Sequence, residues 1–241
     1  MRNLENYIYN ARTEFSDPSI LGVFVENHDN PRFLNRCNDR YKFKNANILS
    51  IFWEGIPVFY YGGEQWFSGG ADPNNREPLW GHYDTDSDMY KSLSIANNVR
   101  TEQKIWKFTQ VQRYADDVFY SFTRGNVLVC VCNGSDVNVK IKGHKFDEGT
   151  VLYNAFNKED FVTVKDGEIN IVLEKKLILE KDVDGIKVVE KKTENELEKE
   201  NENDNDNNYE PNNFMPLDKE DNLKENEGNN TQLKNEKFNK K

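Results

Sequence analysis

The 241-residue sequence contains only three cysteines, too few for a protein held together by a framework of disulfides. The spacing of Cys37, Cys130 and Cys132 matches neither a zinc site nor a disulfide framework. Cys130 and Cys132 face the same side of one expected strand, where a disulfide between them would be strained. The cysteines therefore predict no metal site, and they leave the redox compartment undecided.

Long apolar runs and basic stripes are also absent. No stretch reaches the roughly 18 apolar residues that a membrane helix requires, and residues 1–20 lack the apolar core of a signal peptide. Lys and Arg number 32 against 42 Asp and Glu, a net charge of -10. We expect no nucleic-acid partner and no membrane partner, because both present anionic surfaces. The expected substrate is neutral.

Branched aliphatic residues become rare in the last quarter of the chain. Residues 191–241 hold 14 Asn, 14 Asp or Glu and 9 Lys. Such a segment cannot bury enough apolar surface to offset the entropy of ordering it. We expect a disordered tail over residues 183–241. A solvated appendage is the simpler interpretation of this tail, and an interaction role is the alternative.

What the sequence does contain is a sharp change from apolar to polar residues within Val23–Asn30. Leu21–Val25 predicts a short parallel strand buried on both faces. Two carboxylates, two amides and an imidazole follow it at once, in the order Glu-Asn-His-Asp-Asn. The carboxyl end of a parallel strand faces the ligand crevice in α/β folds. The polar segment therefore predicts a site.

Residues 1–104 alternate between helical and strand patterns. Apolar periodicity predicts helices over residues 3–15, from a cap at 38 or 39 to about 54, and from a cap at 85 or 87 to about 100. Pro57–Tyr61 predicts a second buried strand. This order requires parallel strands with crossover helices. Since two parallel strands cannot bury both their faces, we expect this part to belong to a larger sheet or barrel.

From residue 105 the pattern changes to short alternating runs separated by turn residues. These runs predict an antiparallel all-β module over residues 105–182, which we expect to be a sandwich. The expected strands are 118–123, 126–133, 137–141, 151–154, 161–164, 169–173 and 176–179. The predicted organisation has three parts: 1–104, 105–182 and the tail 183–241.

Three motifs in series resemble the α-amylase family of glycoside hydrolases. Phe24–Phe33 (FVENHDNPRF) resembles the family's seventh-strand motif, Gly55–Gln65 (GIPVFYYGGEQ) the eighth-strand motif, and Gly70–Glu77 (GADPNNRE) the loop after it. The likeness is to fungal-type α-amylases over roughly residues 1–180. The resemblance implies an α/β fold: the last two strands of a (β/α)8 TIM barrel, followed by an antiparallel all-β C-terminal domain.

The resemblance also implies hydrolysis of internal α-1,4-glucosidic bonds of starch-like glucans with retention. Such chemistry needs a carboxylate nucleophile and a carboxylic acid around an oxocarbenium-like transition state. In the family a third carboxylate on the seventh strand stabilises that state, and here it is Asp29. By the same resemblance His28 is both catalytic and substrate-binding, and Asp72 and Arg76 contact glucose near the cleaved bond.

Each of these assignments has a simpler interpretation. Asp29 can belong to an ordinary strand-exit turn with Asn30 and Pro31. His28 can be a loop histidine with satisfied hydrogen bonds, and Asp72 and Arg76 can form an ion pair that only holds the loop. We interpret Glu26 as a local hydrogen-bond partner, not as a catalytic group.

Two of the family's three catalytic carboxylates have no counterpart in the sequence. It contains neither a strand ending in Arg-x-Asp for the nucleophile nor a second strand ending in the acid glutamate, and the family's calcium ligands belong to the same missing region. For a complete member the resemblance implies calcium, an α-glucan partner (starch or maltooligosaccharide), a monomer and secretion. We expect this chain alone to be inactive. The alternative is a non-catalytic α-glucan-binding or interaction protein derived from an amylase.

Overall fold

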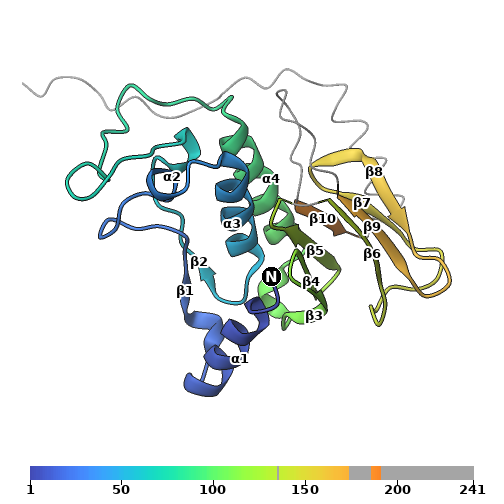
Figure 1. Cartoon of the computed structure of the whole chain (residues 1–241). Coiled ribbons are helices and arrows are strands. Elements are labelled where there is room, and N and C mark those ends of the chain that lie inside the picture. Colours follow the sequence, from blue (N-terminus) through green and yellow to red (C-terminus); the bar gives the residue numbers. More distant parts are fainter. Residues whose placement is uncertain (135, 174–185, 191–241) are drawn as a thin grey trace, which may run out of the picture. The chain divides into compact units, whose positions relative to one another are not determined.

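The computed structural model describes residues 1–134, 136–173 and 186–190, all within one compact unit, Met1–Lys199. Helices come first along this part of the chain, and antiparallel strands follow (Figure 1). No helix among the described residues is long and apolar enough to cross a membrane. The strand predicted at 176–179 and the tail beyond 190 lie outside the described residues.

The described residues form four α-helices, and three of them were predicted from periodicity. They are α1 (Leu4–Glu14), α2 (Phe33–Arg36), α3 (Arg40–Phe52) and α4 (Asp88–Glu102), with 3-10 turns at Pro18–Ile20, Gly63–Gln65 and Ile105–Lys107. α3 begins at a predicted cap, where the Asp39 carboxylate accepts from the Lys42 N–H at 3.1 Å. α2 was not predicted, because four residues are too few to show a helical period.

Two short strands, β1 (Gly22–Val23) and β2 (Ile56–Pro57), pair in parallel. The parallel pairing confirms the order predicted for residues 1–104. The strands are shorter than the predicted Leu21–Val25 and Pro57–Tyr61, because among the described residues each pairs only with the other. α3 lies between them in sequence and packs against α4 (Figure 1).

The prediction that β1 and β2 are buried on both faces is wrong for the described residues. The side chains in and beside the two strands stay accessible: Phe24 is 52% exposed, Ile56 53% and Val58 51%. A near-continuous apolar sequence shows that a strand is suited to burial. It does not show whether neighbouring strands and helices are present to bury it. An apolar surface is therefore left on this pair.

The remaining strands of the described residues form two sheets. The antiparallel pairing was predicted, and the sandwich stays a prediction. One sheet has the order β3-β4-β5-β10-β7-β8, and the other pairs β6 with β9. The bounds are β3 Val111–Ala115, β4 Phe119–Arg124, β5 Val127–Cys132, β6 Val137–Ile141, β7 Val151–Asn154, β8 Asn157–Thr163, β9 Ile169–Leu173 and β10 Ile186–Glu190. The predicted boundary between residues 104 and 105 stays a prediction.

Strands β3 and β10 were not predicted. β10 lies inside the segment expected to be disordered, and it corrects that expectation for residues 186–190. It pairs antiparallel with β5 and β7, and Val188 and Val189 are fully buried. The acidic, Asn-rich composition of the following residues obscured this short branched-aliphatic run.

β5 separates two apolar clusters. Leu128, Cys130 and Cys132 face a cluster shared with β6 and β9, and the three valines of β5 face a cluster shared with α3 and α4. Successive side chains of a strand point to opposite faces, so all six residues of β5 are buried. Cys130 and Cys132 share one face of β5, as predicted.

Candidate functional site

The polar segment after β1 turns at Asn27. The Asn27 side-chain oxygen accepts from the Asp29 N–H at 3.0 Å and from Asn30 Nδ2 at 3.1 Å. Asn favours such turns because its side chain can close a hydrogen bond onto its own backbone two residues on. The turn leaves the next side chains accessible: His28 is 61% exposed and Asp29 69%.

The four residues predicted from the family motifs lie together. His28 Nε2 is 3.3 Å from Asp29 Oδ1, and Arg76 Nη1 donates to Asp72 Oδ1 at 2.6 Å. Arg76 Nη2 also donates to the His28 carbonyl at 3.3 Å, which joins the two pairs. The result is an accessible cluster of an imidazole, a guanidinium and two carboxylates.

Exposed ion pairs of this kind add little to stability, typically about 0–1 kcal/mol. The Arg76 and Asp72 side chains are 44% and 57% exposed, so solvent screens their attraction. The predicted ion pair between them is present, and it supports the loop-holding interpretation as much as the sugar-binding one. A role for these residues in binding sugar stays a prediction.

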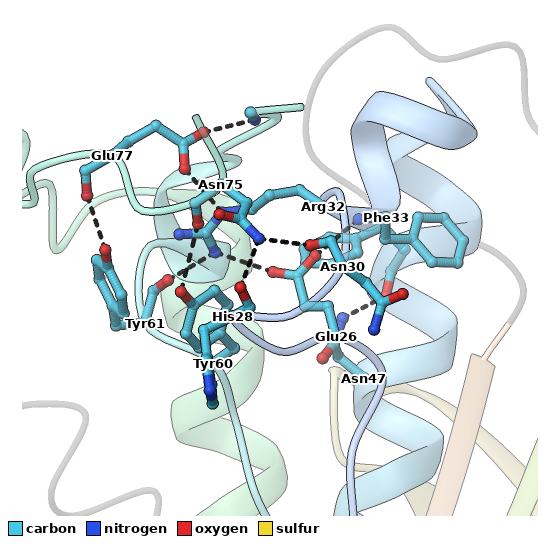
Figure 2. A network of polar contacts seen from close by, with 12 residues as sticks. Glu26, His28, Asn30, Arg32, Phe33, Asn47, Tyr60, Tyr61, Asn75 and Glu77 are labelled. Atoms are coloured by element: carbon cyan, nitrogen blue, oxygen red, sulfur yellow. Dashed lines mark hydrogen bonds and ion pairs between the residues drawn. The ribbon is translucent and has the colours of Figure 1, made fainter. Parts of the chain in front are cut away.

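A buried network centred on Arg32 lies next to this cluster (Figure 2). Arg32 is fully buried, and its Nη1 donates to Glu26 Oε1 at 3.1 Å and to the Tyr61 carbonyl at 2.7 Å. Its Nε donates to Glu77 Oε2 at 2.9 Å. The guanidinium also lies 4.4 Å from the centre of the Tyr60 ring, a cation–π contact. Arg32 thus links the end of β1 to the loop after β2.

Glu26 is a structural partner in this network. Its Oε2 accepts from the Phe33 N–H at 2.8 Å, at the start of α2. Burial raises the pKa of Glu26, while the Phe33 N–H and the Arg32 charge oppose that rise. The contacts confirm the interpretation of Glu26 as a local hydrogen-bond partner.

Several hydrogen bonds hold the long loop between β2 and α4 in place. Glu77 accepts from the Gly69 N–H and, through its carbonyl, from the Tyr61 hydroxyl at 3.0 Å. The Gly69 carbonyl accepts from the Arg32 N–H at 3.0 Å. A Cβ on Gly69 would lie 1.7 Å from the Asn74 carbonyl oxygen, so only glycine fits there. The loop is therefore held firmly beside the cluster.

Sequence reasoning missed Arg32, Asn75 and Glu77. A signal was present: Arg32 stands next to Phe33 and Leu34 in the sequence, and an arginine that is buried with such residues needs carboxylate partners. Its two partners, Glu26 and Glu77, are 6 and 45 residues away. Glu77, the more distant partner, reaches Arg32 only when the chain folds.

The described residues do not fit a calcium ion. No group of three or more His, Cys, Asp or Glu among them could hold a metal. The two exposed carboxylates of the cluster, Asp29 and Asp72, already face an imidazole and a guanidinium. No step of the chemistry is derived through a metal.

Comparison with known proteins agrees with the motifs. Residues 1–123 match the family "Alpha amylase, catalytic domain". Alpha-amylase 2 of Schwanniomyces occidentalis is 40% identical over 137 residues, covering 56% of this chain and 26% of the relative. Alpha-amylase of Saccharomycopsis fibuligera is 36% identical over 159 residues, covering 61% and 32%. The chain spans roughly a quarter to a third of the length of these curated relatives.

Solved structures show the same relationship. An alpha-amylase from Malbranchea cinnamomea superimposes with a TM-score of 0.70 at 27% identity, covering 78% of this chain and 40% of that one. The alpha-amylase of Geobacillus thermoleovorans, solved with acarbose, gives 0.64 at 22% identity, covering 80% and 44%, and shows the fold alone. The family match extends over about half of the chain and implies a TIM-barrel-like α/β fold. The chain belongs to the α-amylase family of glycoside hydrolases.

Proposed function

We propose that this chain is the sugar-holding part of a retaining α-amylase that cleaves internal α-1,4-glucosidic bonds of starch-like glucans. The observation that carries the proposal is the accessible cluster of His28, Asp29, Asp72 and Arg76, joined by the bond from Arg76 to the His28 carbonyl. These four residues come from two separate family motifs. Their meeting at one place supports a common ligand.

Asp29 would stabilise the transition state. Charge develops on the sugar as the bond breaks, and a fixed carboxylate attracts that cation more strongly than the neutral ground state. At about 4 Å and an effective dielectric constant near 20, the attraction is on the order of 4 kcal/mol. The turn closed by Asn27 fixes the backbone of this carboxylate.

The other three side chains suit a neutral, hydroxyl-rich ligand. A carboxylate accepts from sugar hydroxyls, while an imidazole N–H and a guanidinium donate to them. Arg76 and Asp72 together can bind a vicinal pair of hydroxyls through charge-assisted hydrogen bonds. A cluster with both signs of charge fits a neutral glucan better than an anion.

The bond-breaking groups would come from a part of the barrel outside these 241 residues. Retention needs a nucleophile and an acid about 5–5.5 Å apart, and neither of their motifs is in the sequence. In the same proposal the strands β3–β10 are the C-terminal sandwich, and the complete protein is a secreted monomer whose calcium ligands lie elsewhere. The chain alone would then not hydrolyse starch.

A chimaera tests the proposal. The matching part of the Schwanniomyces occidentalis alpha-amylase 2 would be replaced by the corresponding residues of this chain. We expect the chimaera to release reducing sugar from starch, and Asp29→Asn to lower kcat by about 100- to 1000-fold, because a charged stabiliser is lost. Asp147→Asn, at an exposed site in the loop after β6, is the matched control and should leave kcat unchanged. A folded Asp29→Asn chimaera with near-normal kcat would exclude the role of Asp29.

The second candidate is a non-catalytic α-glucan-binding protein. In this candidate a separate partner chain would cover the exposed Phe24, Ile56 and Val58, whereas in the first candidate further strands of the barrel would cover them. Isothermal titration of the 241-residue chain with maltoheptaose separates the candidates. Binding that Asp29→Asn removes, together with a folded but inactive chimaera, would support the second candidate.

A further inference from the structure

We propose that Asn75 is a positioning residue that fixes the backbone on both sides of Asp29. Asn75 Nδ2 donates to the His28 carbonyl at 2.7 Å and to the Asn30 carbonyl at 2.8 Å (Figure 2). One buried side chain from the loop after β2 thus holds the residues immediately before and after the proposed stabilising carboxylate. The consequence for sugar binding rests on the proposed function, while the effect on the backbone does not.

The chemistry of the acceptors fixes the orientation of the Asn75 amide. Backbone carbonyls only accept hydrogen bonds, so the Nδ2 atom has to face both of them. The Oδ1 atom then points elsewhere, and it is buried without a hydrogen-bond partner in the part of the chain that the structure describes. An unpartnered buried oxygen costs free energy. The two hydrogen bonds that Asn75 donates therefore explain the position of its side chain, and its own oxygen does not.

Burial makes Asn75 a firmer support than its neighbours. Asn75 is fully buried, whereas Asp29 is 69% exposed and Arg76, which also donates to the His28 carbonyl, is 44% exposed. A hydrogen bond shielded from water is less open to exchange with solvent than an exposed one. A carboxylate that stabilises a developing charge works best when it is fixed before the reaction. Asn75 supplies that fixation from a buried position.

The loop that carries Asn75 is itself held by hydrogen bonds. The Tyr60 hydroxyl donates to the Asn75 carbonyl at 3.3 Å. Two residues further on, Glu77 accepts from the buried Arg32 at 2.9 Å. Arg32 follows the turn that contains Asp29. The loop is therefore joined to this part of the chain through Arg32 as well as through Asn75 (Figure 2).

Hydrogen exchange of the full 241-residue chain tests the effect on the backbone. The amides of Asp29, Arg32 and Phe33 are hydrogen-bonded within or beside the turn and report its opening. We expect Asn75→Ala to speed their exchange by about 10- to 100-fold, since two hydrogen bonds are lost, while the amides of α3 keep their rates. Asn74→Ala, at the exposed neighbouring residue, is the matched control and should change neither.

Asn75→Ala removes the two donated hydrogen bonds and also leaves a cavity, so further variants are needed to tell which change speeds the exchange. Asn75→Asp keeps the shape of the side chain but puts an oxygen in place of the donor, and we expect the same local acceleration. If both Asn75 variants fail to fold, Tyr60→Phe removes the hydroxyl that donates to the Asn75 carbonyl and should give a smaller acceleration at the same three amides. Unchanged exchange at these amides, or equal acceleration at them and in α3, overturns the proposal.

Titration with maltoheptaose extends the test to the ligand. We expect Asn75→Ala to weaken maltoheptaose binding by about tenfold and Asn75→Asp at least as much, at a temperature where both stay folded. Wild-type affinity in a variant with accelerated exchange would overturn the link between backbone order and the ligand. If the folded Asp29→Asn chimaera keeps a near-normal kcat, the proposed function fails, and the exchange data still decide the role of Asn75.

Discussion

β5 and the β1–β2 pair have the same kind of sequence but different surroundings. β5 reads Val-Leu-Val-Cys-Val-Cys and buries all six residues. The segments around β1 and β2, Leu21–Val25 and Pro57–Tyr61, are as apolar, yet Phe24 and Val58 are about half exposed. The residues of the strands themselves do not distinguish the two cases, whereas the number of predicted parallel strands does, because two of them cannot bury both their faces.

The difference lies in the neighbours of each strand. β5 pairs with β4 and β10 and has an apolar cluster on each face. Among the described residues, β1 and β2 pair only with each other. A parallel pair buried by helices alone is not a stable arrangement, and such strands normally lie inside a larger sheet. The exposed apolar side chains therefore form a surface suited to further strands of a barrel.

A matched pair of aspartate substitutions gives the largest expected effect. Val129→Asp places a charge at a fully buried position of β5, and Val58→Asp places it at a 51% exposed position beside β2. We expect Val129→Asp to lower the free energy of unfolding by more than about 4 kcal/mol, because the charge has no partner there. Val58→Asp should cost less than about 1 kcal/mol. Urea unfolding followed by circular dichroism measures both.

If Val58→Asp destabilises the chain as strongly as Val129→Asp, the side chain of Val58 is covered in solution. Self-association of the 241-residue chain is then the first explanation to check, and sedimentation of the wild type and of Val58→Asp would show it.

The second prediction concerns Arg124, which joins the helices to the sheet. Arg124 is 2% exposed, and its Nη1 donates to the carbonyls of Phe52 and Trp53, at the end of α3, at 3.1 and 2.7 Å. Burial, followed by the charge of Arg100, lowers its pKa to about 10. We expect Arg124→Ala to reduce the free energy of unfolding by about 2–4 kcal/mol, because buried carbonyls lose their donors. Thermal unfolding measures this loss.

Arg113→Ala is the matched control for Arg124. Arg113 lies on β3 in the same sheet but donates to Thr123 Oγ1 at 2.9 Å and not to α3. Arg113→Ala should therefore reduce the free energy of unfolding by less than Arg124→Ala. Arg124→Lys should recover only part of the stability, since an ammonium cannot reproduce the planar fork of donors. Equal losses for Arg124→Ala and Arg113→Ala would contradict a special link between α3 and the sheet.

Much of the fold could be predicted from the sequence, because its local signals are strong. Periodicity and the Asp39 cap predicted α3, and alternating patterns predicted strands such as β6 and β9 with their residues. β10 was missed because a five-residue strand at the edge of an acidic, Asn-rich region has no pattern of its own. Its partners, β5 and β7, are distant in sequence.

The members of the candidate site were predicted from the family motifs, and their role in binding sugar stays a prediction. His28 and Asp29 belong to the motif after β1, and Asp72 and Arg76 stand four residues apart in the motif after β2. The buried network that supports them was missed, since Arg32 and Glu77 meet only after folding. Contacts across 45 residues leave no local periodicity to read.

The smallest expected effect tests whether the strand region gains stability from surface charge. Lys140 and Lys142, on and just after β6, each lie 2.8 Å from the Glu168 carboxylate and lower its pKa to about 2 from the ordinary 4.5. A carboxyl whose pKa falls on folding adds stability above its unfolded pKa. We therefore expect a small loss of stability as the pH falls from about 4.5 through about 2.

Urea midpoints at pH 7, 4 and 2.5 measure this loss. Glu168→Gln should be slightly less stable than the wild type at pH 7 and should lose less on acidification, because the titrating group is gone. Glu159→Gln, at an exposed position of β8, is the matched control and should keep the slope of the wild type. The lysines are 67% and 73% exposed, so 1 M salt should remove most of the difference. A Glu168→Gln slope equal to that of the wild type would show that the ion pairs of Glu168 add no measurable stability.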